Sequence, residues 1–386
     1  MKKVYTSLCF ILLFLLFSGC SAIIETSTTQ IRPVESQTIN MENPGEFISI
    51  HHQDDLTLSI WTMLDNHTET QRFRIHHLQG GNGILWVNNA IQEIMASPLG
   101  AFGVSTIIPN ILAEGGTLTE IELSIVYART QGEIAAVLSV HDSGTLSILL
   151  AQALRRGDPF LAVHTPQNIA NISFLESTIG DIFHTPGFDI IAFPQVEIHL
   201  YPSFTTGNQR IAEIQLDFHF SPSEIFQMRT ELQSAANSFL ENMPEYLEVD
   251  QQVLWLAQNL SPRLQLISQE QQEEDPLAPI YHTAYNALVH GQASSQGIAL
   301  LTHGLLSQLG IESYLILGSI NEEEHAWNLL QIGNYFFHID MSAFLRQAPQ
   351  YALFLSDETM LFELGYNWDM LRFPRADSPL TYFDFH

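Results

Sequence analysis

The sequence predicts an α+β fold, because two different hydrophobic periods occupy separate parts of the chain. Apolar and polar residues alternate over 196–201 and 213–218, a pattern typical of half-buried strands. Apolar residues recur at steps of three and four over 225–240 and 298–309, a pattern typical of amphipathic helices. We therefore expect strands and helices that pack together in ordinary hydrophobic cores.

The first residues predict an exported chain. Lys2 and Lys3 precede an unbroken apolar run from Leu8 to Phe17, and small residues then lead to Cys20. A basic start, an apolar stretch of about half the length of a membrane-spanning helix and a small-residue exit are typical of a secretory signal peptide. We expect residues 1–19 to be a signal peptide that is removed.

Phe17-Ser18-Gly19-Cys20 resembles the lipobox of bacterial lipoproteins. The resemblance implies that Cys20 becomes the first residue of the mature chain and carries fatty acyl groups such as palmitate, which anchor it to the membrane. The expected location is the outer face of the bacterial cytoplasmic membrane. Residues 20–46 are rich in Ser, Thr, Gln and Asn and poor in apolar residues, so we expect a flexible tether there.

Charge and cysteine content exclude several functions. The chain has 42 acidic and 14 basic residues and a formal net charge of −28, and both lysines lie in the predicted signal peptide. Nucleic-acid binding needs clustered cations, so no nucleic-acid partner is expected. Attraction to anionic lipid headgroups is disfavoured as well, which leaves the acyl chains as the anchor. Cys9 and Cys20 are the two cysteines, so the folded body has neither a disulfide nor a thiol.

Residues 47–220 are predicted to form a mixed α+β N-terminal domain, within which we find no internal repeat. A helix is expected over 145–155 and a strand over 160–164. The two alternating segments within 190–201 and 211–220 predict a β-hairpin, because Thr205-Thr206-Gly207-Asn208 supplies turn residues between them.

Residues 221–386 are predicted to form a second domain. Ser221-Pro222-Ser223-Glu224 is a helix-start signal, and the apolar period continues to about Leu240. The further expected elements are a helix over 246–259, a polar acidic loop over 268–274, helices over 278–289 and 294–309, and strands over 312–318, 325–332 and 335–340.

The helix over 294–309 places Ser295 in its first turn. Backbone amides there lack partners within the helix, and the helix dipole favours negative charge. Gly310 is the expected left-handed stop at the other end. The strands that follow place His325 and Asp340 on neighbouring strands of one α+β core.

Several motifs occur in a fixed order over 283–340. They are Ala284-Tyr285, the nine residues GQASSQGIA from Gly291 to Ala299, His325-Ala326-Trp327-Asn328, and His338-Ile339-Asp340. This segment is similar to the core of the bacterial transglutaminase-like superfamily, whose papain-type pattern is roughly AY-x-ALV-x-G-x-x-x-C-x-G-x-A, then LGI, HAWN and a histidine two residues before an aspartate. Residues 354–360, with Gly365-Tyr366 and Trp368-Asp369, also resemble secreted members. The resemblance implies a transglutaminase-like (papain-type) fold for 221–386.

The resemblance also implies roles for particular residues. Ser295 occupies the position of the nucleophilic cysteine, His325 that of the general base, and Asp340 that of the group that orients the histidine. Trp327 and Asn328 are expected to line the cleft. Two departures are present: serine replaces cysteine, and Met341-Ser342-Ala343 replaces the Pro/Val-Thr-Trp that commonly follows the aspartate.

The serine has two interpretations. A cysteine beside histidine forms a thiolate-imidazolium pair before substrate arrives, whereas a serine hydroxyl must lose its proton during attack. Loss of catalysis is therefore the expected outcome, with serine-dependent acyl transfer as the alternative. Ser294 or Ser295 could instead simply cap the helix, because serine is a favoured N-cap. In that case the bond between His325 and Asp340 holds two strands together.

Three functions remain open from the sequence. The favoured one is a membrane-anchored lipoprotein whose transglutaminase-like domain has lost its thiol and binds a peptide, protein or cell-wall ligand. The second is a serine-dependent acyl transferase or amidase, and the third is a structural envelope protein. We expect no cofactor, and no metal, since the neighbours in His51-His52 and in His76-His77 point to opposite faces of a strand.

Overall fold

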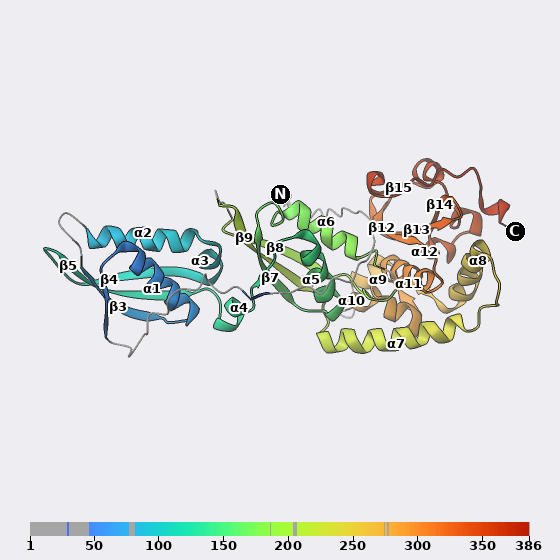
Figure 1. Ribbon diagram of the computed structural model, residues 1–386. Helices are drawn as coiled ribbons and strands as arrows, with labels where there is room; N and C mark the ends of the chain where they lie inside the picture. Colours follow the sequence, from blue (N-terminus) through green and yellow to red (C-terminus); the bar gives the residue numbers. More distant parts are fainter. Residues whose placement is uncertain are drawn as a thin grey trace, which may run out of the picture.

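The computed structural model describes residues 29–30, 46–76, 82–185, 187–203, 207–273, 275 and 278–385. They form three units of helices packed on sheets, and the units lie in a row (Figure 1). The predicted signal peptide, Cys20 and most of the predicted tether lie outside the described residues. Within the described ranges, no helix combines the length and apolar composition that crossing a membrane requires.

The first unit has a four-stranded sheet with the order β2-β3-β5-β4. Strand β2 is parallel to β3 and the other pairs are antiparallel. The sheet buries one face, including Ile121 and Leu123, against apolar residues of the first two helices such as Leu56 and Val87. The elements are β2 (Phe47–Ile50), α1 (Gln53–Asp65), β3 (Thr70–His76), α2 (Gly83–Ala96), α3 (Pro98–Gly103), β4 (Val104–Gly115) and β5 (Leu118–Tyr127).

The second unit contains the predicted hairpin, helix and strand. Its sheet has the order β1-β6-β7-β9-β8, and β8 pairs antiparallel with β9. The first of these strands, β1 (Thr29–Gln30), comes from the segment expected to be a tether and pairs with β6. The other elements are α4 (Gln131–Ala135), β6 (Leu138–Ser139), α5 (Ser143–Arg156), β7 (Phe160–Pro166), α6 (Ile172–Ile182), β8 (Gln195–Tyr201) and β9 (Gln209–Asp217).

The first two units share one topology. In each, two parallel strands joined by a helix are followed by a second helical segment and a hairpin whose last strand pairs with the second strand. A capping box follows each hairpin, formed by Thr130 with Glu133 and by Ser221 with Glu224. The segment 47–220 therefore contains two copies of a β-α-β-α-β-β unit. No repeat was expected there, because topology can repeat without residue identity.

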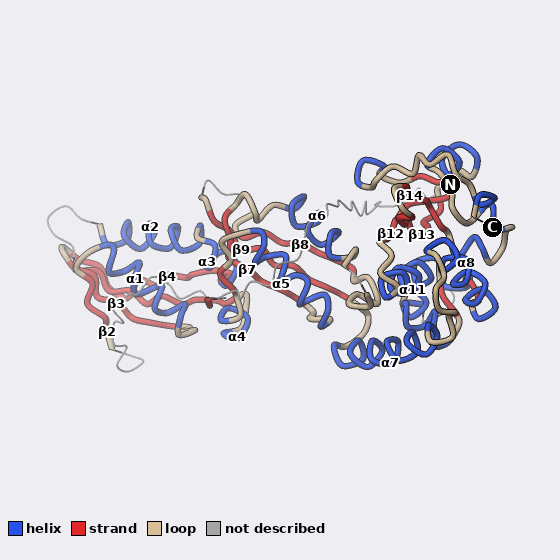
Figure 2. The backbone as a smooth tube through the Cα atoms, turned by 45° about the vertical axis from the view of Figure 1, so that its right-hand side comes forward, coloured by secondary structure: helices blue, strands red, loops and turns tan. Residues whose placement is uncertain are grey.

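The third unit is built around helix α11 (Ser295–Gln308). Figures 1 and 2 show this helix between a sheet and the long helix α7, and residues on all its sides are buried. The sheet is antiparallel with the order β14-β13-β12-β15. The other elements are α7 (Pro222–Leu240), α8 (Val249–Leu260), β10 (Gln265–Leu266), α9 (Gln269–Glu273), α10 (Ala278–Tyr281), β11 (Gln292–Ala293), β12 (Ser313–Ile320), β13 (Glu323–Ile332), β14 (Tyr335–Ile339), α12 (Met341–Phe344) and β15 (Tyr366–Asn367).

The second and third units share one continuous buried core. Phe188, which follows α6, lies against α11, and a Cβ added to Gly304 would be 2.0 Å from its ring. The helix therefore needs glycine at this position for the ring to pack closely.

Two expected elements before α11 differ in the structure. The segment 268–274, expected to be a loop, contains the short helix α9, and Ser268 donates its backbone N–H to Gln271 across the helix start. The helix expected over 278–289 is interrupted after Tyr281. The Tyr281 carbonyl accepts the backbone N–H of Ser294 at 2.9 Å, a partner from outside the helix. A π-helical turn over 286–290 then ends at Gly291, whose φ is +73°.

Candidate functional site

The start of helix α11 is capped by Ser294. Its hydroxyl oxygen accepts the backbone N–H of Gly297 at 3.4 Å and donates to the Tyr281 carbonyl at 3.2 Å. His282 lies on the same oxygen, with Nδ1 at 2.9 Å, and because the serine proton is used by Tyr281 the imidazole is the donor. The sequence left the cap open between Ser294 and Ser295, and the structure assigns it to Ser294.

Gly297 allows the chain before the helix to lie close to its first turn. A Cβ at this position would be 2.5 Å from the Tyr281 carbonyl oxygen and 2.9 Å from that of Thr283. These are backbone atoms, so the contact could not be relieved by a side-chain rotation. Ser295 beside it is half-buried, and its hydroxyl has no hydrogen bond to any described residue.

His325 and Asp340 form a close pair where β14 ends beside β13. Nε2 of His325 lies 2.6 Å from Oδ2 of Asp340. The Asp340 side chain is 1% exposed and that of His325 is 15% exposed, so the imidazole is the member of the pair that reaches the surface. Asp340 follows β14 directly and is the N-cap of α12, where its Oδ1 accepts the backbone N–H of Ala343 at 2.9 Å.

Two hydroxyl groups complete the surroundings of the Asp340 carboxylate. Ser342 donates to Oδ1 at 2.6 Å and Tyr366 donates to Oδ2 at 2.7 Å. Burial alone would raise the pKa of Asp340, but the charge of His325 and the hydrogen bonds from His325, Ser342 and Ala343 lower the pKa below its ordinary value. Burial and the Asp340 charge raise the pKa of Tyr366, so the phenol keeps its proton and remains a donor. The carboxylate is therefore ionised and held by four hydrogen bonds.

Nδ1 of His325 is the ring nitrogen available for chemistry. Nε2 is occupied by Asp340, and Oγ of Ser342 also lies 3.3 Å from Nε2. Nδ1 has no hydrogen-bond partner among the described residues. A ligand or a nucleophile that met this imidazole would therefore meet Nδ1.

Helix α11 and strand β13 run in the same direction. Asn328 of β13 donates its side-chain amide to the Ala299 carbonyl of α11 at 3.0 Å. His303 lies one turn further along the helix, and its Nδ1 lies 2.9 Å from Oγ of Ser313, which pairs with Leu330 of β13. Residues later in the helix therefore lie beside residues later in the strand.

Ser295 stands one turn before Ala299 along the helix. His325 stands three residues before Asn328 along β13. Because the helix and the strand advance together, Ser295 and His325 lie at the same end of this layer. No hydrogen bond joins them in the part of the chain that the structure describes. The structure thus brings His325 and Asp340 into contact and places Ser295 at their end of the layer without contact.

Trp327 lies beneath His325. The two rings are nearly parallel, with an angle of 25° between their planes and 6.1 Å between their centroids. Trp327 and Asn328, which were expected to line the cleft, are both 0% exposed. They support the site from opposite faces of β13 instead: Asn328 faces α11 through its bond to Ala299, and Trp327 faces the other side, where it packs with Tyr366 and Trp368.

Several residues that contact the site were not predicted from the sequence. Tyr366 and Ser342 bind the Asp340 carboxylate, and His282 binds the helix cap. Two signals were available: Gly365-Tyr366 belonged to the resemblance, and Ser342 keeps a hydroxyl two residues after the aspartate. Neither signal shows by itself which oxygen the hydroxyl would reach.

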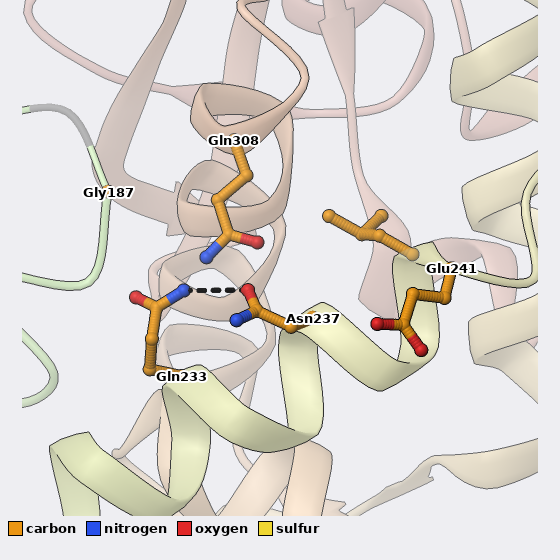
Figure 3. Close-up of a pocket in the computed structure, with 6 residues that line it drawn as sticks. Gly187, Gln233, Asn237, Glu241 and Gln308 are labelled. Carbon is orange, nitrogen blue, oxygen red and sulfur yellow. Dashed lines mark hydrogen bonds between the residues drawn. The ribbon is translucent and has the colours of Figure 1, made fainter.

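Neither of two hollows on the surface includes the candidate site. One, of about 530 Å³, lies between α7 and the last turn of α11, where the side-chain amide of Gln233 donates to Asn237 at 3.0 Å (Figure 3). Gln308 lines it, at the opposite end of α11 from Ser295 and about 20 Å away by helix rise. The other, of about 350 Å³, lies on the second unit beside Phe160.

No protein-family model matches the chain, and no curated protein matches it. The solved structures that are similar to it include the following two. One is a TGase with 10% sequence identity and a TM-score of 0.27, over 77% of this chain and 57% of that chain. The other is a candidate cysteine protease from Cytophaga hutchinsonii with 14% identity and a TM-score of 0.25, over 46% of this chain and 68% of that chain. The chain thus spans 57% of the length of the TGase.

Proposed function

We propose that the chain is an exported lipoprotein whose third unit is a transglutaminase-like domain with serine in the nucleophile position, and that this domain binds a peptide or cell-wall amide without turning it over. The observation that carries the proposal is the His325–Asp340 pair, which is held at 2.6 Å at the same end of the layer as Ser295. The ordered motifs over 283–340 support the transglutaminase-like part of the proposal.

The chemistry of the pair favours binding over turnover. In a cysteine enzyme the imidazole ionises the thiol in advance, and the helix start stabilises the thiolate. Ser295 offers no such ionised group, because a hydroxyl gives up its proton only during attack. What remains is a half-buried helix start with outward-pointing amides, at the same end of the layer as a donor or acceptor at Nδ1 of His325. These groups are complementary to the carbonyl and N–H of an amide.

The rest of the chain would supply the anchor and the spacing. The lipobox-like Phe17-Ser18-Gly19-Cys20 supports acylation at Cys20 on the outer face of the bacterial cytoplasmic membrane. The two β-α-β-α-β-β units stand before the third unit in the row seen in Figure 1. In this proposal the second unit, whose sheet includes β1 shortly after Cys20, connects the anchor to the binding domain.

A second candidate function is serine-dependent acyl transfer or amide hydrolysis through Ser295, His325 and Asp340. The observation that favours it is that Ser294, and not Ser295, caps helix α11. Because Ser294 fills the capping role, the hydroxyl of Ser295 is not committed to the helix. In this reading Nδ1 of His325 would take the serine proton as a substrate carbonyl is attacked.

A serine-reactive fluorophosphonate separates the two functions. Under the binding proposal the folded protein shows no label on Ser295 by peptide mapping, and soluble muropeptides bind with an affinity that His325→Ala lowers by about tenfold. His199→Ala, which changes an exposed histidine of β8, is the matched control and leaves binding unchanged. Label on Ser295 that His325→Ala abolishes would replace the binding proposal with the serine enzyme. Equal binding by His325→Ala and His199→Ala would show that His325 takes no part in binding.

A further inference from the structure

A second His–Asp pair lies directly behind the candidate site. The indole N–H of Trp327 donates to Nδ1 of His338 at 3.1 Å, and Nε2 of His338 lies 2.9 Å from Oδ1 of Asp357. Trp327 and His338 are 0% exposed and Asp357 is 7% exposed. The indole thus connects the second pair to the ring of His325, which it stacks beneath.

The hydrogen bonds define the protonation state of His338. An indole N–H can only donate, so Nδ1 of His338 accepts and its single proton is on Nε2, where it is donated to Asp357. Burial lowers the pKa of His338 and outweighs the opposing effect of Asp357, which agrees with a neutral ring. A proton added at Nδ1 would break the bond to Trp327.

The indole is confined on its other sides as well. Gly318 leaves room for it, because a Cβ at that position would be 2.7 Å from the indole ring. Tyr366 and Trp368 meet it edge-on, with centroids at 5.0 Å and 5.6 Å. With its edge tied to His338, the indole has one orientation available, and its face is the surface on which the His325 ring rests.

Packing alone does not require the second pair. Backbone bonds already hold β14 to β13, in a register that pairs Leu329 with His338. Burying a carboxylate and an imidazole is costly, and apolar residues of similar size would fill the same space at no such cost. A directional contact to the indole is what a leucine in place of His338 could not supply.

We propose that His338 and Asp357 are positioning residues, which hold the Trp327 indole by a hydrogen bond so that it fixes the ring plane of His325. The inference rests on the proposed function, in that it takes His325 as the group that faces the ligand. His338 acts through Trp327 and touches neither ligand nor reacting atoms.

The test compares two replacements of His338 in the intact protein. His338→Leu removes the acceptor for the indole N–H, whereas His338→Gln keeps an acceptor for Trp327 and a donor for Asp357. In ¹⁵N NMR spectra we expect His338→Leu to weaken the contact between the His325 and Trp327 rings and to mix the His325 tautomers, and His338→Gln to restore the parent pattern. His303→Leu is the control, because His303 is also buried and hydrogen-bonded but lies on α11 away from Trp327.

A second readout uses a thiol introduced by Ser295→Cys. We expect His338→Leu to slow its alkylation by about tenfold and to shift the pH profile of the rate, while His338→Gln and His303→Leu stay within about twofold of the parent. If His338→Leu does not fold, Trp327→Phe carries the test, since it keeps an aromatic ring beneath His325 and removes the indole N–H.

The positioning role is overturned if His338→Leu, or Trp327→Phe in its place, leaves the His325 signals as in the parent. The proposed function fails separately. If the introduced thiol is no more reactive than an ordinary cysteine in the parent chain, the site lacks its expected chemistry, while the NMR spectra of the chain with Ser295 still test the role of His338.

Discussion

The phenol of Tyr366 donates a 2.7 Å hydrogen bond to the Asp340 oxygen that also lies 2.6 Å from Nε2 of His325. Tyr366 belongs to β15, which is paired to β12 at the far side of the sheet from β14. A residue from the opposite edge of the sheet therefore completes the surroundings of the buried carboxylate. The pair is held from two directions, and each hydroxyl on the carboxylate should contribute to stability.

Tyr366→Phe removes the phenol and leaves the ring. We expect a loss of about 2 kcal/mol in the free energy of unfolding, because a hydrogen bond to a buried charge is lost. Chemical denaturation at neutral pH measures it. Tyr314→Phe is the matched control: Tyr314 donates at the same 2.7 Å to Glu312 in a partly exposed place, and its loss should be well below that of Tyr366→Phe. Similar losses of stability in the two variants would show that the hydrogen bond to Asp340 stabilises the fold no more than the partly exposed one to Glu312.

The interface between the second and third units should weaken in acid. His184 and His303 meet edge-on there at 6.5 Å, and His184 accepts the backbone N–H of Leu315 at 3.1 Å. Burial lowers the pKa of His303 to about 4, against an opposing hydrogen bond with the Thr185 carbonyl. Burial, with the nearby charges of His303 and Arg372, lowers the pKa of His184 to about 3.

Both folded pKa values lie below the ordinary value of 6.5. At pH values between the folded and the ordinary pKa, the unfolded chain therefore binds more protons than the folded chain. Their contribution is therefore complete above pH 6.5 and is lost as the pH falls toward 4 for His303 and 3 for His184. The loss of unfolding free energy between neutral and acidic pH should be smaller in His303→Gln by on the order of 3 kcal/mol. Unfolding free energies measured at a series of pH values test this. His199→Gln, which changes an exposed histidine, should leave the slope unchanged, and an unchanged slope for His303→Gln would contradict the interface account.

Gly297→Ala should destabilise the start of α11. The added methyl group would meet the Tyr281 and Thr283 carbonyl oxygens at 2.5 Å and 2.9 Å, so the backbone has to move. We expect a cost of about 1–3 kcal/mol in thermal or chemical unfolding. Gly132→Ala is the matched control in the first turn of α4, where the nearest atom is 3.9 Å away. Alanine favours helix, so the control should be neutral or stabilising, and a stable Gly297→Ala would mean that the preceding segment does not close on the helix.

Local patterns in the sequence predict the elements of this fold well. Helix α7 follows the Ser221–Glu224 capping box, and the hairpin of β8 and β9 follows the alternation of apolar and polar residues. The left-handed stop expected at Gly310 has φ +73°. In each case residues within one or two turns of the chain decide the structure.

Contacts between distant segments were the part that local patterns could not predict. The sequence offers two adjacent serines at the start of α11, and the partners that select Ser294 come from Tyr281 and His282 in the preceding segment. Tyr366 reaches Asp340 through the pairing of β15 with β12, which no periodicity encodes.

We propose that Ser295 stands where a thiol would meet His325, and the pH dependence of alkylation of a thiol introduced by Ser295→Cys measures this most directly. Peptide mapping distinguishes it from Cys9 and Cys20. We expect a midpoint about one unit or more below the ordinary thiol value of about 8.5, and a return toward it when His325→Ala is added. Ser307→Cys, in the last turn of the same helix where the dipole has the opposite sign, should show no lowering. A midpoint for Ser295→Cys at or above the ordinary value, unchanged by His325→Ala, would contradict the account.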